Sequence, residues 1–205
     1  MKTILVPTDF NELATAALRY AAQIAAATGA EIVVLYADRF EPPAEFTAAQ
    51  AQLLVVSIAE SRRRADEELT AYVREVVPDG VAVRTEVRED FPAAAIRALA
   101  DEIDADLIVM GTHGRGRLSR ILFGSVAEAV LRDTRRPVLT VRSTKANDIR
   151  TIACVDEGAS PFAASLAGRL GAELVSDRAG ADLIVTCERD TALVRQSPVP
   201  VLTVR

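Results

Sequence analysis

The sequence has few of the residues that build metal sites and disulfides. It contains one histidine, His113, and two cysteines, Cys154 and Cys187, which lie far apart and form no Cys-x-x-Cys pair. A structural zinc site needs about four Cys or His ligands close together, so this composition argues against one. Two widely separated cysteines are typical of small buried apolar residues in a reducing compartment, and we expect no disulfide.

The sequence also lacks a long hydrophobic run. No apolar stretch approaches the roughly 18 residues that a membrane span requires, and the longest, Leu53–Ala59, is typical of one face of a helix. The first residues reach Pro7 and Asp9 too early to supply the apolar core of a signal peptide. We therefore expect a cytoplasmic protein that does not bind membranes.

An excess of positive charge is absent as well. The 24 Lys and Arg residues against 29 Asp and Glu give a net charge of −5. Phosphate backbones attract basic patches, so this balance argues against nucleic-acid binding as the main role. Half of the residues are hydrophobic, which excludes a disordered chain, and 205 residues suffice for one large domain or two small ones.

Strand-like and helix-like patterns alternate through residue 142. Short apolar runs rich in β-branched residues predict buried strands, and a period-2 pattern over 81–87 predicts a half-buried edge strand. The buried strands are predicted at residues 3–7, 31–36, 105–110 and 137–142, and helices at 11–27, 46–77, 92–103 and 125–132. Asn11 and Gly29 are the predicted start and stop signals of the first helix. The alternation indicates an α/β fold, a three-layer α/β/α sandwich with a parallel sheet, which binds ligands at the carboxyl ends of its strands.

Four segments of the sequence recur in the same order after residue 150. The matching pairs are 3–4 and 151–152, 29–33 and 171–175, 105–109 and 181–185, and 137–142 and 200–205. The last two pairs are identical in sequence, and Asp156 follows Thr151-Ile152 as Asp9 follows Thr3-Ile4. Unrelated buried strands share composition but not six-residue identities in register. We interpret the recurrence as an internal duplication.

The second copy is abbreviated. Between Val33 and Ala105 lie 71 residues, whereas only five lie between Val175 and Ala181. Counterparts of the long helix, the third strand and the third helix are therefore missing. This divides the chain into a complete domain at 1–142, a polar linker at 143–150 and a truncated, degenerate domain at 151–205.

A glycine-bearing loop at Gly111–Ser125 follows the fourth predicted strand and opens a helix. Glycines let backbone N–H groups approach an anion, and a helix N-terminus adds unpaired donors and a positive dipole end. Arg115, Arg117 and Arg120 make the loop basic in an acidic protein. The loop could thus hold a polyphosphate, or its glycines could only form a tight connection. Its spacing matches neither a Walker loop nor a dinucleotide fingerprint.

The spacing Gly-x2-Gly-x9-Gly-Ser resembles the ATP-binding signature of the universal stress protein family. It is carried here by Gly111, Gly114, Gly124 and Ser125. The resemblance covers residues 1–142 and includes three more segments, Ile-Leu-Val-Pro-Thr-Asp at 4–9, Gly-Thr-His-Gly at 111–114 and Arg-Pro-Val-Leu-Thr-Val at 136–141. It implies the family's adenine nucleotide α-hydrolase-like fold, a five-stranded parallel sheet of order 3-2-1-4-5.

The resemblance also implies which residues contact an adenine nucleotide. Pro7, Thr8 and Asp9 match the turn after the first strand, where the family's Asp lies by the adenosine, and Ala37 matches the position whose backbone meets adenine. The phosphate-and-ribose loop is matched by Met110, Gly111, His113, Gly114, Gly124, Ser125 and Val126. For His113 this gives a contact role rather than a catalytic one. From its position alone, Asp9 could accept from a ribose hydroxyl, cap the following helix, or do both.

The function implied is that of an ATP-binding regulatory protein of the stress response. ATP hydrolysis needs a positioned water or base and stabilisation of the transferred charge, and the sequence offers neither a P-loop Lys nor a second motif-bound acidic residue. We expect at most slow hydrolysis, no catalytic residue, no metal ligand, and Mg²⁺ carried by the phosphates. The nucleotide could also be AMP or a cyclic nucleotide.

Two alternatives stay open. One is a nucleotide-free protein-interaction module. The other is a slow ATP-hydrolysing enzyme of the α-hydrolase-like group, although Thr8-Asp9-Phe10-Asn11 stands where that group has a Ser-Gly-Gly pyrophosphate loop.

For the second copy we expect no ATP binding. It lacks the glycine signature and carries Glu188-Arg189-Asp190 in that region. The family's last strand is commonly its dimer contact, so Pro137–Arg142 could pair with Pro200–Arg205 and imitate a homodimer within one chain. The alternative is a decayed appendage that only covers apolar surface. A further homodimer of whole chains stays open.

Overall fold

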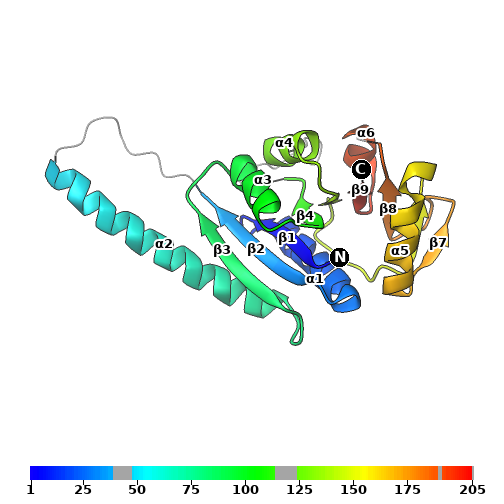
Figure 1. The fold of residues 1–205 in the computed structure, drawn as a ribbon, viewed down its shortest axis with the longest axis horizontal. Helices are drawn as coiled ribbons and strands as arrows, with labels where there is room; N and C mark the ends of the chain where they lie inside the picture. Colours follow the sequence, from blue (N-terminus) through cyan, green and yellow to red (C-terminus); the bar gives the residue numbers. More distant parts are fainter. Residues whose placement is uncertain (39–47, 114–123, 189–190, 205) are drawn as a thin grey trace.

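The structure is a computed structural model that describes residues 1–38, 48–113, 124–188 and 191–204, with the side chains of 48–57 outside that description. The described residues form a nine-stranded sheet of order β3-β2-β1-β4-β5-β9-β8-β6-β7 (Figure 1). Its strands are β1 (Thr3–Thr8), β2 (Glu31–Ala37), β3 (Val83–Arg88), β4 (Leu107–Gly111), β5 (Val138–Val141), β6 (Thr151–Cys154), β7 (Glu173–Val175), β8 (Leu183–Thr186) and β9 (Val201–Thr203). All neighbouring pairs are parallel except β5 and β9.

Helices lie on both faces of this sheet, as the sequence predicts. They are α1 (Glu12–Thr28), α2 (Ala48–Val76), α3 (Pro92–Glu102), α4 (Ser125–Asp133), α5 (Ser160–Leu170) and α6 (Thr191–Gln196), with a 3-10 turn η1 (Glu157–Ala159). The first five strands have the order 3-2-1-4-5, which confirms the predicted α/β fold. We call residues 1–142 the first lobe and residues 151–204 the second lobe.

Alternation along the strands creates the two apolar layers. In β1, Ile4 and Val6 pack in the cluster that includes α1 and α2, whereas Leu5 packs in the cluster that includes α3 and α4. Successive side chains of a strand point to opposite faces, so a continuous apolar strand is buried on both sides. The predicted caps of α1 are confirmed, since the Asn11 side chain accepts from Ala14 N and Gly29 ends the helix at φ +71°. Helix ends at such positive φ favour glycine.

The strands of the second lobe repeat the order of the first without a counterpart of β3. The series β7-β6-β8-β9 has the same arrangement as β2-β1-β4-β5. The registers agree too: Ile4 is aligned with Ile32 in the first lobe, and Ile152 is aligned with Leu174 in the second. The additional strands therefore extend the sheet of the first lobe with the same pairing geometry.

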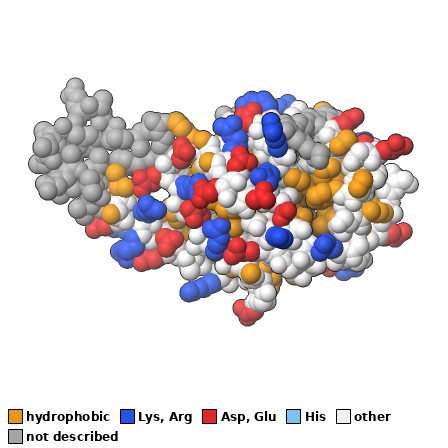
Figure 2. All heavy atoms as spheres, in the orientation of Figure 1, with side chains coloured by type: hydrophobic (Ala, Val, Ile, Leu, Met, Phe, Trp, Pro, Cys, Tyr) orange, Lys and Arg blue, Asp and Glu red, His pale blue; other side chains and the backbone are white. Residues whose placement is uncertain are grey.

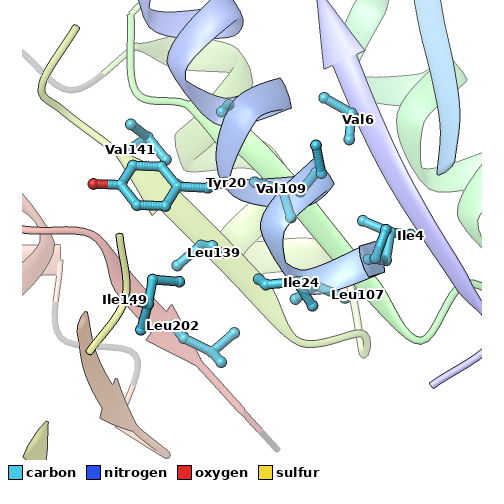
Figure 3. Packing of buried hydrophobic residues seen from close by; sticks show 14 of the residues in the cluster. Ile4, Val6, Tyr20, Ile24, Leu107, Val109, Leu139, Val141, Ile149 and Leu202 are labelled. Carbon is cyan, nitrogen blue, oxygen red and sulfur yellow. The ribbon is translucent and has the colours of Figure 1, made fainter. Parts of the chain in front are cut away.

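The two lobes meet where β5 and β9 pair antiparallel, with Leu139 opposite Leu202. Both leucines are buried in one apolar cluster that runs through both lobes, and Figure 3 shows them close to Ile149 of the linker. The linker is held on α1 by hydrogen bonds, since Asn147 N donates to the hydroxyl of Tyr20, and Gln23 exchanges hydrogen bonds with the backbone of Asn147 and Ile149. Burial raises the pKa of Tyr20 more than the Asn147 hydrogen bond lowers it.

The two outer strands of the sheet differ in their surface. On β3, Arg84 forms an ion pair with Glu31 at 3.5 Å, and Arg88 forms one with Glu102 at 2.7 Å. Figure 2 shows positive and negative side chains interspersed in the middle of this face. Charges along an edge oppose pairing with another chain. On the other edge, β7 is short and its Leu174 is 45% exposed.

Both cysteines are unpaired in the structure, as expected. The expectation that both are buried is wrong, because Cys187 is exposed and Cys154 only partly buried. The reason is that Cys187 directly follows β8 rather than lying within it. None of the helices in the described ranges has the length and apolar character that crossing a bilayer requires.

Candidate functional site

A cavity of about 310 Å³ opens at the carboxyl ends of β1 and β4. The strand order reverses between these two neighbours, and ligands of open α/β sheets bind at such a point. The cavity is lined by Pro7, Thr8, Asp9, Ala14, Ala37, Pro92, Met110, Gly111, Thr112, His113, Gly124, Ser125, Val126 and Ala127. We call it the strand-end pocket.

The pocket brings together the residues that the sequence singled out from four separate segments. Pro7, Thr8, Asp9, Ala37, Met110, Gly111, His113, Gly124, Ser125 and Val126 all line it. Gly114 and the three loop arginines lie outside the described residues. The lining residues that sequence reasoning missed are Ala14, Pro92, Thr112 and Ala127. Thr112 and Ala127 were adjacent to predicted positions, whereas Pro92 enters only because α3 begins beside the end of β2 in space.

Gly111 lets the start of α1 approach the end of β4. A Cβ at this position would lie 3.0 Å from Leu13 Cβ and 3.2 Å from the backbone carbon of Leu13. Such distances are tighter than ordinary contacts, so a larger residue would push β4 and α1 apart. The glycine thus brings the first turn of α1 against the pocket.

Gly124 closes the other end of the loop. Its N–H donates to Thr112 O at 2.7 Å, and a Cβ would lie 2.7 Å from the same oxygen. Backbone conformation does not require glycine here, because φ is −68°. The close approach to a carbonyl requires it, and it brings the N-terminus of α4 to the pocket.

The N-terminus of α4 gives the pocket its backbone donors. Ser125 is the first residue of the helix, and its cap residue Gly124 supplies no side-chain hydrogen bond. The first N–H groups of a helix have no partner within the helix and carry its positive dipole end. This part of the pocket is therefore suited to an anion.

Asp9 is held at the pocket by its neighbour Asn11. The backbone N–H of Asn11 donates to Asp9 Oδ1 at 3.2 Å, and Asn11 Nδ2 donates to Asp9 Oδ2 at 3.1 Å. The role of capping α1, one of the two considered for Asp9, belongs instead to Asn11. Asp9 lies two residues too early in the chain to reach the first turn of the helix. Between them, Phe10 adopts a left-handed conformation at φ +64° and packs against Tyr36 and Tyr72.

His113 is placed by hydrogen bonds at both its ring and its backbone. Its Nδ1 lies 2.9 Å from the hydroxyl of Thr112, which is fully buried. Its carbonyl accepts from Asn11 Nδ2 at 2.8 Å. His113, near the start of the glycine loop, is thus attached to the start of α1.

The corresponding strand ends of the second lobe are arranged differently. Cys187 follows β8 at the place where Gly111 ends β4. The carboxylate of Asp156 accepts from the hydroxyl of Thr186 at 2.7 Å, from Cys187 N at 2.9 Å and from Ala159 N at 3.0 Å. Burial would raise the pKa of Asp156, but the hydrogen bonds from Cys187 and Thr186 outweigh it and hold the pKa below its usual value. This carboxylate ties the strand ends of its own lobe together.

Comparison with known proteins assigns the first lobe to a family. Residues 1–142 match the model of the Universal stress protein family. Universal stress protein MJ0531 of Methanocaldococcus jannaschii is 36% identical over 145 residues, covering 70% of this chain and 84% of that protein. Universal stress protein Sll1388 of Synechocystis is 30% identical over 148 residues, covering 68% of this chain and 96% of that protein.

Two solved structures show how far the fold is shared. The structure of MJ0577 matches 68% of this chain and 94% of its own with a TM-score of 0.54 and 28% identity. A universal stress protein from Archaeoglobus fulgidus matches 99% of this chain and 98% of its own with a TM-score of 0.71. At 18% identity this second likeness concerns the fold alone, and it extends over both lobes.

Proposed function

The chain belongs to the universal stress protein family, and we propose that it is an ATP-binding regulatory protein of the stress response, with one nucleotide held by the first lobe. The observation that carries the proposal is the strand-end pocket, which is lined by every described residue of the family's binding pattern. These residues come from distant parts of the chain. Their convergence on one cavity is what a shared ligand would require.

The chemistry of the pocket fits the parts of an adenine nucleotide. The N-terminus of α4 and the close-packed glycines suit the phosphates, since a Cβ at Gly124 would meet a backbone oxygen. Asp9 supplies a carboxylate that can accept from a ribose hydroxyl. Ala37 and Pro92 give the base a small apolar wall on the side of β2. Mg²⁺ would be held through the phosphates, with few protein ligands.

Regulation rather than rapid turnover is the proposed output. Among the described lining residues, Asp9 is the one carboxylate and His113 the one imidazole. Asp9 accepts hydrogen bonds from Asn11, and His113 Nδ1 lies 2.9 Å from the hydroxyl of Thr112. Without a positioned water and charge stabilisation, hydrolysis is slow. The regulatory signal would then be whether ATP is bound to the chain, not the products of its hydrolysis.

For the second lobe we propose a degenerate copy, 151–205, joined by the linker 143–150 to the complete domain 1–142. Two observations support duplication: the shared strand registers and the shared aspartate anchors. Asp106 accepts from the backbone N–H groups of Lys2 and Thr3, and Asp182 accepts from those of Arg150 and Thr151. Asp156 forms hydrogen bonds with Thr186 and Cys187 at the strand ends of this lobe, and we therefore expect the second lobe to bind no ATP.

We further propose that the second lobe takes the place of a dimer partner. The antiparallel alignment puts Leu139 opposite Leu202, which are equivalent positions of the repeat. Equivalent residues face each other across a two-fold axis in a symmetric dimer. The chain would thus satisfy the outer edge of β5 internally. In sedimentation, the full chain should be monomeric, whereas a chain ending at residue 142 should dimerise.

The test of nucleotide binding begins with the purified full chain. The protein is denatured, and any released nucleotide is identified by mass spectrometry. Calorimetric titration of nucleotide-free protein with ATP and Mg²⁺, and with AMP as a comparison, then gives the affinity. Binding of one ATP per chain supports the proposal. Neither released nucleotide nor binding would instead favour a protein-interaction module. Rapid phosphate release, abolished by Gly124→Ala, would favour a hydrolytic enzyme.

A further inference from the structure

We propose that Asn11 is the positioning residue of the strand-end pocket, which sets the Asp9 carboxylate and the start of the glycine loop in the geometry that binds nucleotide. This inference rests on the proposed ATP site. The side-chain amide of Asn11 makes three hydrogen bonds, to Asp9 Oδ2 at 3.1 Å, to His113 O at 2.8 Å and from Ala14 N at 2.7 Å. One residue therefore connects three segments of the pocket.

The two ends of the amide have separate tasks. The oxygen, Oδ1, accepts from Ala14 N and caps α1. The nitrogen, Nδ2, donates to Asp9 and to His113, which are residues of the two segments on either side of the pocket. Capping needs only an acceptor, which Ser and Asp supply as well as Asn. Only an amide also offers two N–H donors.

The donor end is what binding would depend on. A hydrogen bond to a carboxylate is charge-assisted and is stronger than one between neutral groups. With the Nδ2 donor in place, Asn11 holds both carboxylate oxygens of Asp9. The same donor also binds the carbonyl of His113, a residue 102 positions later in the sequence. Without it, Asp9 Oδ2 and the carbonyl of His113 each lose the hydrogen bond that joins them to Asn11, and holding them in the bound geometry would cost more ordering entropy.

The structure also indicates which substitutions separate positioning from capping. Asn11→Ser keeps an acceptor for Ala14 N but removes both N–H donors. Asn11→Asp keeps the acceptor and adds a second carboxylate beside Asp9, which repels it. Asn11→Ala removes the cap and the donors together.

We expect Asn11→Ser to weaken ATP binding about 10-fold, because two hydrogen bonds that order the pocket are lost. Asn11→Ala should melt about 2–4 °C below Asn11→Ser, because both variants lose the N–H donors but only Asn11→Ala also loses the cap. Asn11→Asp should bind more weakly than Asn11→Ser. The measurements are calorimetric titration with MgATP and thermal unfolding of the full chain without nucleotide.

A double-variant cycle with Asp9→Asn distinguishes positioning from an independent contact. If Asn11 acts through Asp9, Asn11→Ser should weaken binding less in the Asp9→Asn background than in the wild type. Fully additive losses, or an Asn11→Ser variant that binds as well as the wild type, would overturn the inference. A wild-type chain that binds no ATP would instead refute the proposed site itself.

Discussion

The two lobes have the same strand framework but opposite arrangements at the ends of their strands. β1 and β6 are each anchored by the aspartate that directly precedes the neighbouring strand, Asp106 before β4 and Asp182 before β8. The registers with β2 and β7 agree as well. In the first lobe, glycine ends β4 and a pocket opens there. In the second, Cys187 follows β8 and Asp156 bonds to it.

Under the proposed function, this difference would place nucleotide binding in a few residues that follow the strands rather than in the sheet itself. The hydrogen bonds that Asp9 makes to Asn11 keep it at the rim of the strand-end pocket. Asp156 instead accepts hydrogen bonds from Thr186 and Cys187 at the carboxyl end of β8. Under the proposed duplication, the second lobe would keep the register of the sheet without the site, because the aspartate anchors lie at the opposite ends of the strands.

The largest expected effect comes from adding one methyl group at Gly124, which packs against the residue after β4, with Gly158, which packs against the residue after β8, as its counterpart. At Gly124 a Cβ would lie 2.7 Å from Thr112 O, and at Gly158 it would lie 2.9 Å from Cys187 Sγ. Backbone must move in the first case, whereas a side chain can rotate in the second. Gly124→Ala should weaken ATP binding about 100-fold, near 2.7 kcal/mol, and Gly158→Ala should leave the affinity unchanged. Titration of both variants measures this.

Circular dichroism of the two glycine variants provides the control. Both should retain the wild-type helix and strand signal, since each change is local. If Gly158→Ala lost ATP affinity as strongly as Gly124→Ala, the second lobe would take part in binding and the contrast between the lobes would fail.

The elements of the first lobe were predictable because they depend on local patterns, whereas most of the residues that line the strand-end pocket were singled out by the family resemblance. Apolar runs predicted the strands, and the glycine spacing predicted a loop that the pocket indeed contains at its described ends, Gly111 and Gly124. The tether from Asn11 to His113 joins residues 102 positions apart, and no sequence pattern signals it. The same holds for Pro92, whose place depends on how α3 packs on β2. Side-chain hydrogen bonds between distant segments follow from packing, which periodicity does not encode.

The next effect concerns the aspartates that anchor both lobes alike. Burial would raise the pKa of Asp106 and of Asp182, but hydrogen bonds from the backbone of Lys2 and Thr3, and of Arg150 and Thr151, lower both below the ordinary value. Asp106→Asn and Asp182→Asn should each reduce the free energy of unfolding at pH 7 by about 1.5 kcal/mol, as for hydrogen bonds to charged groups. Urea unfolding measures this difference.

The pH dependence of the same variants has a definite sign. A carboxylate whose folded pKa is lowered contributes stability that is fully present above the ordinary pKa of about 4, and that is lost as the pH falls through the folded pKa. The difference between wild type and each variant should therefore shrink below about pH 4. A difference in unfolding free energy that stays constant down to pH 2 would contradict the role of charge. If Asp182→Asn alone unfolded in two separate transitions, the second lobe would unfold on its own.

The smallest expected effect tests how symmetric the contact between β5 and β9 is. Thr140 and Thr203 are equivalent positions of the repeat, and both are buried. Thr140 Oγ1 donates to Val201 O at 3.0 Å, whereas within the described part of the chain Thr203 Oγ1 has no hydrogen-bond partner. Thr140→Val should cost about 1 kcal/mol of unfolding free energy, and Thr203→Val should be neutral or slightly stabilising, because it removes a buried hydroxyl that forms no hydrogen bond. Equal losses in urea unfolding would mean that both hydroxyls are bonded, and that the contact has the side-chain symmetry of a true dimer.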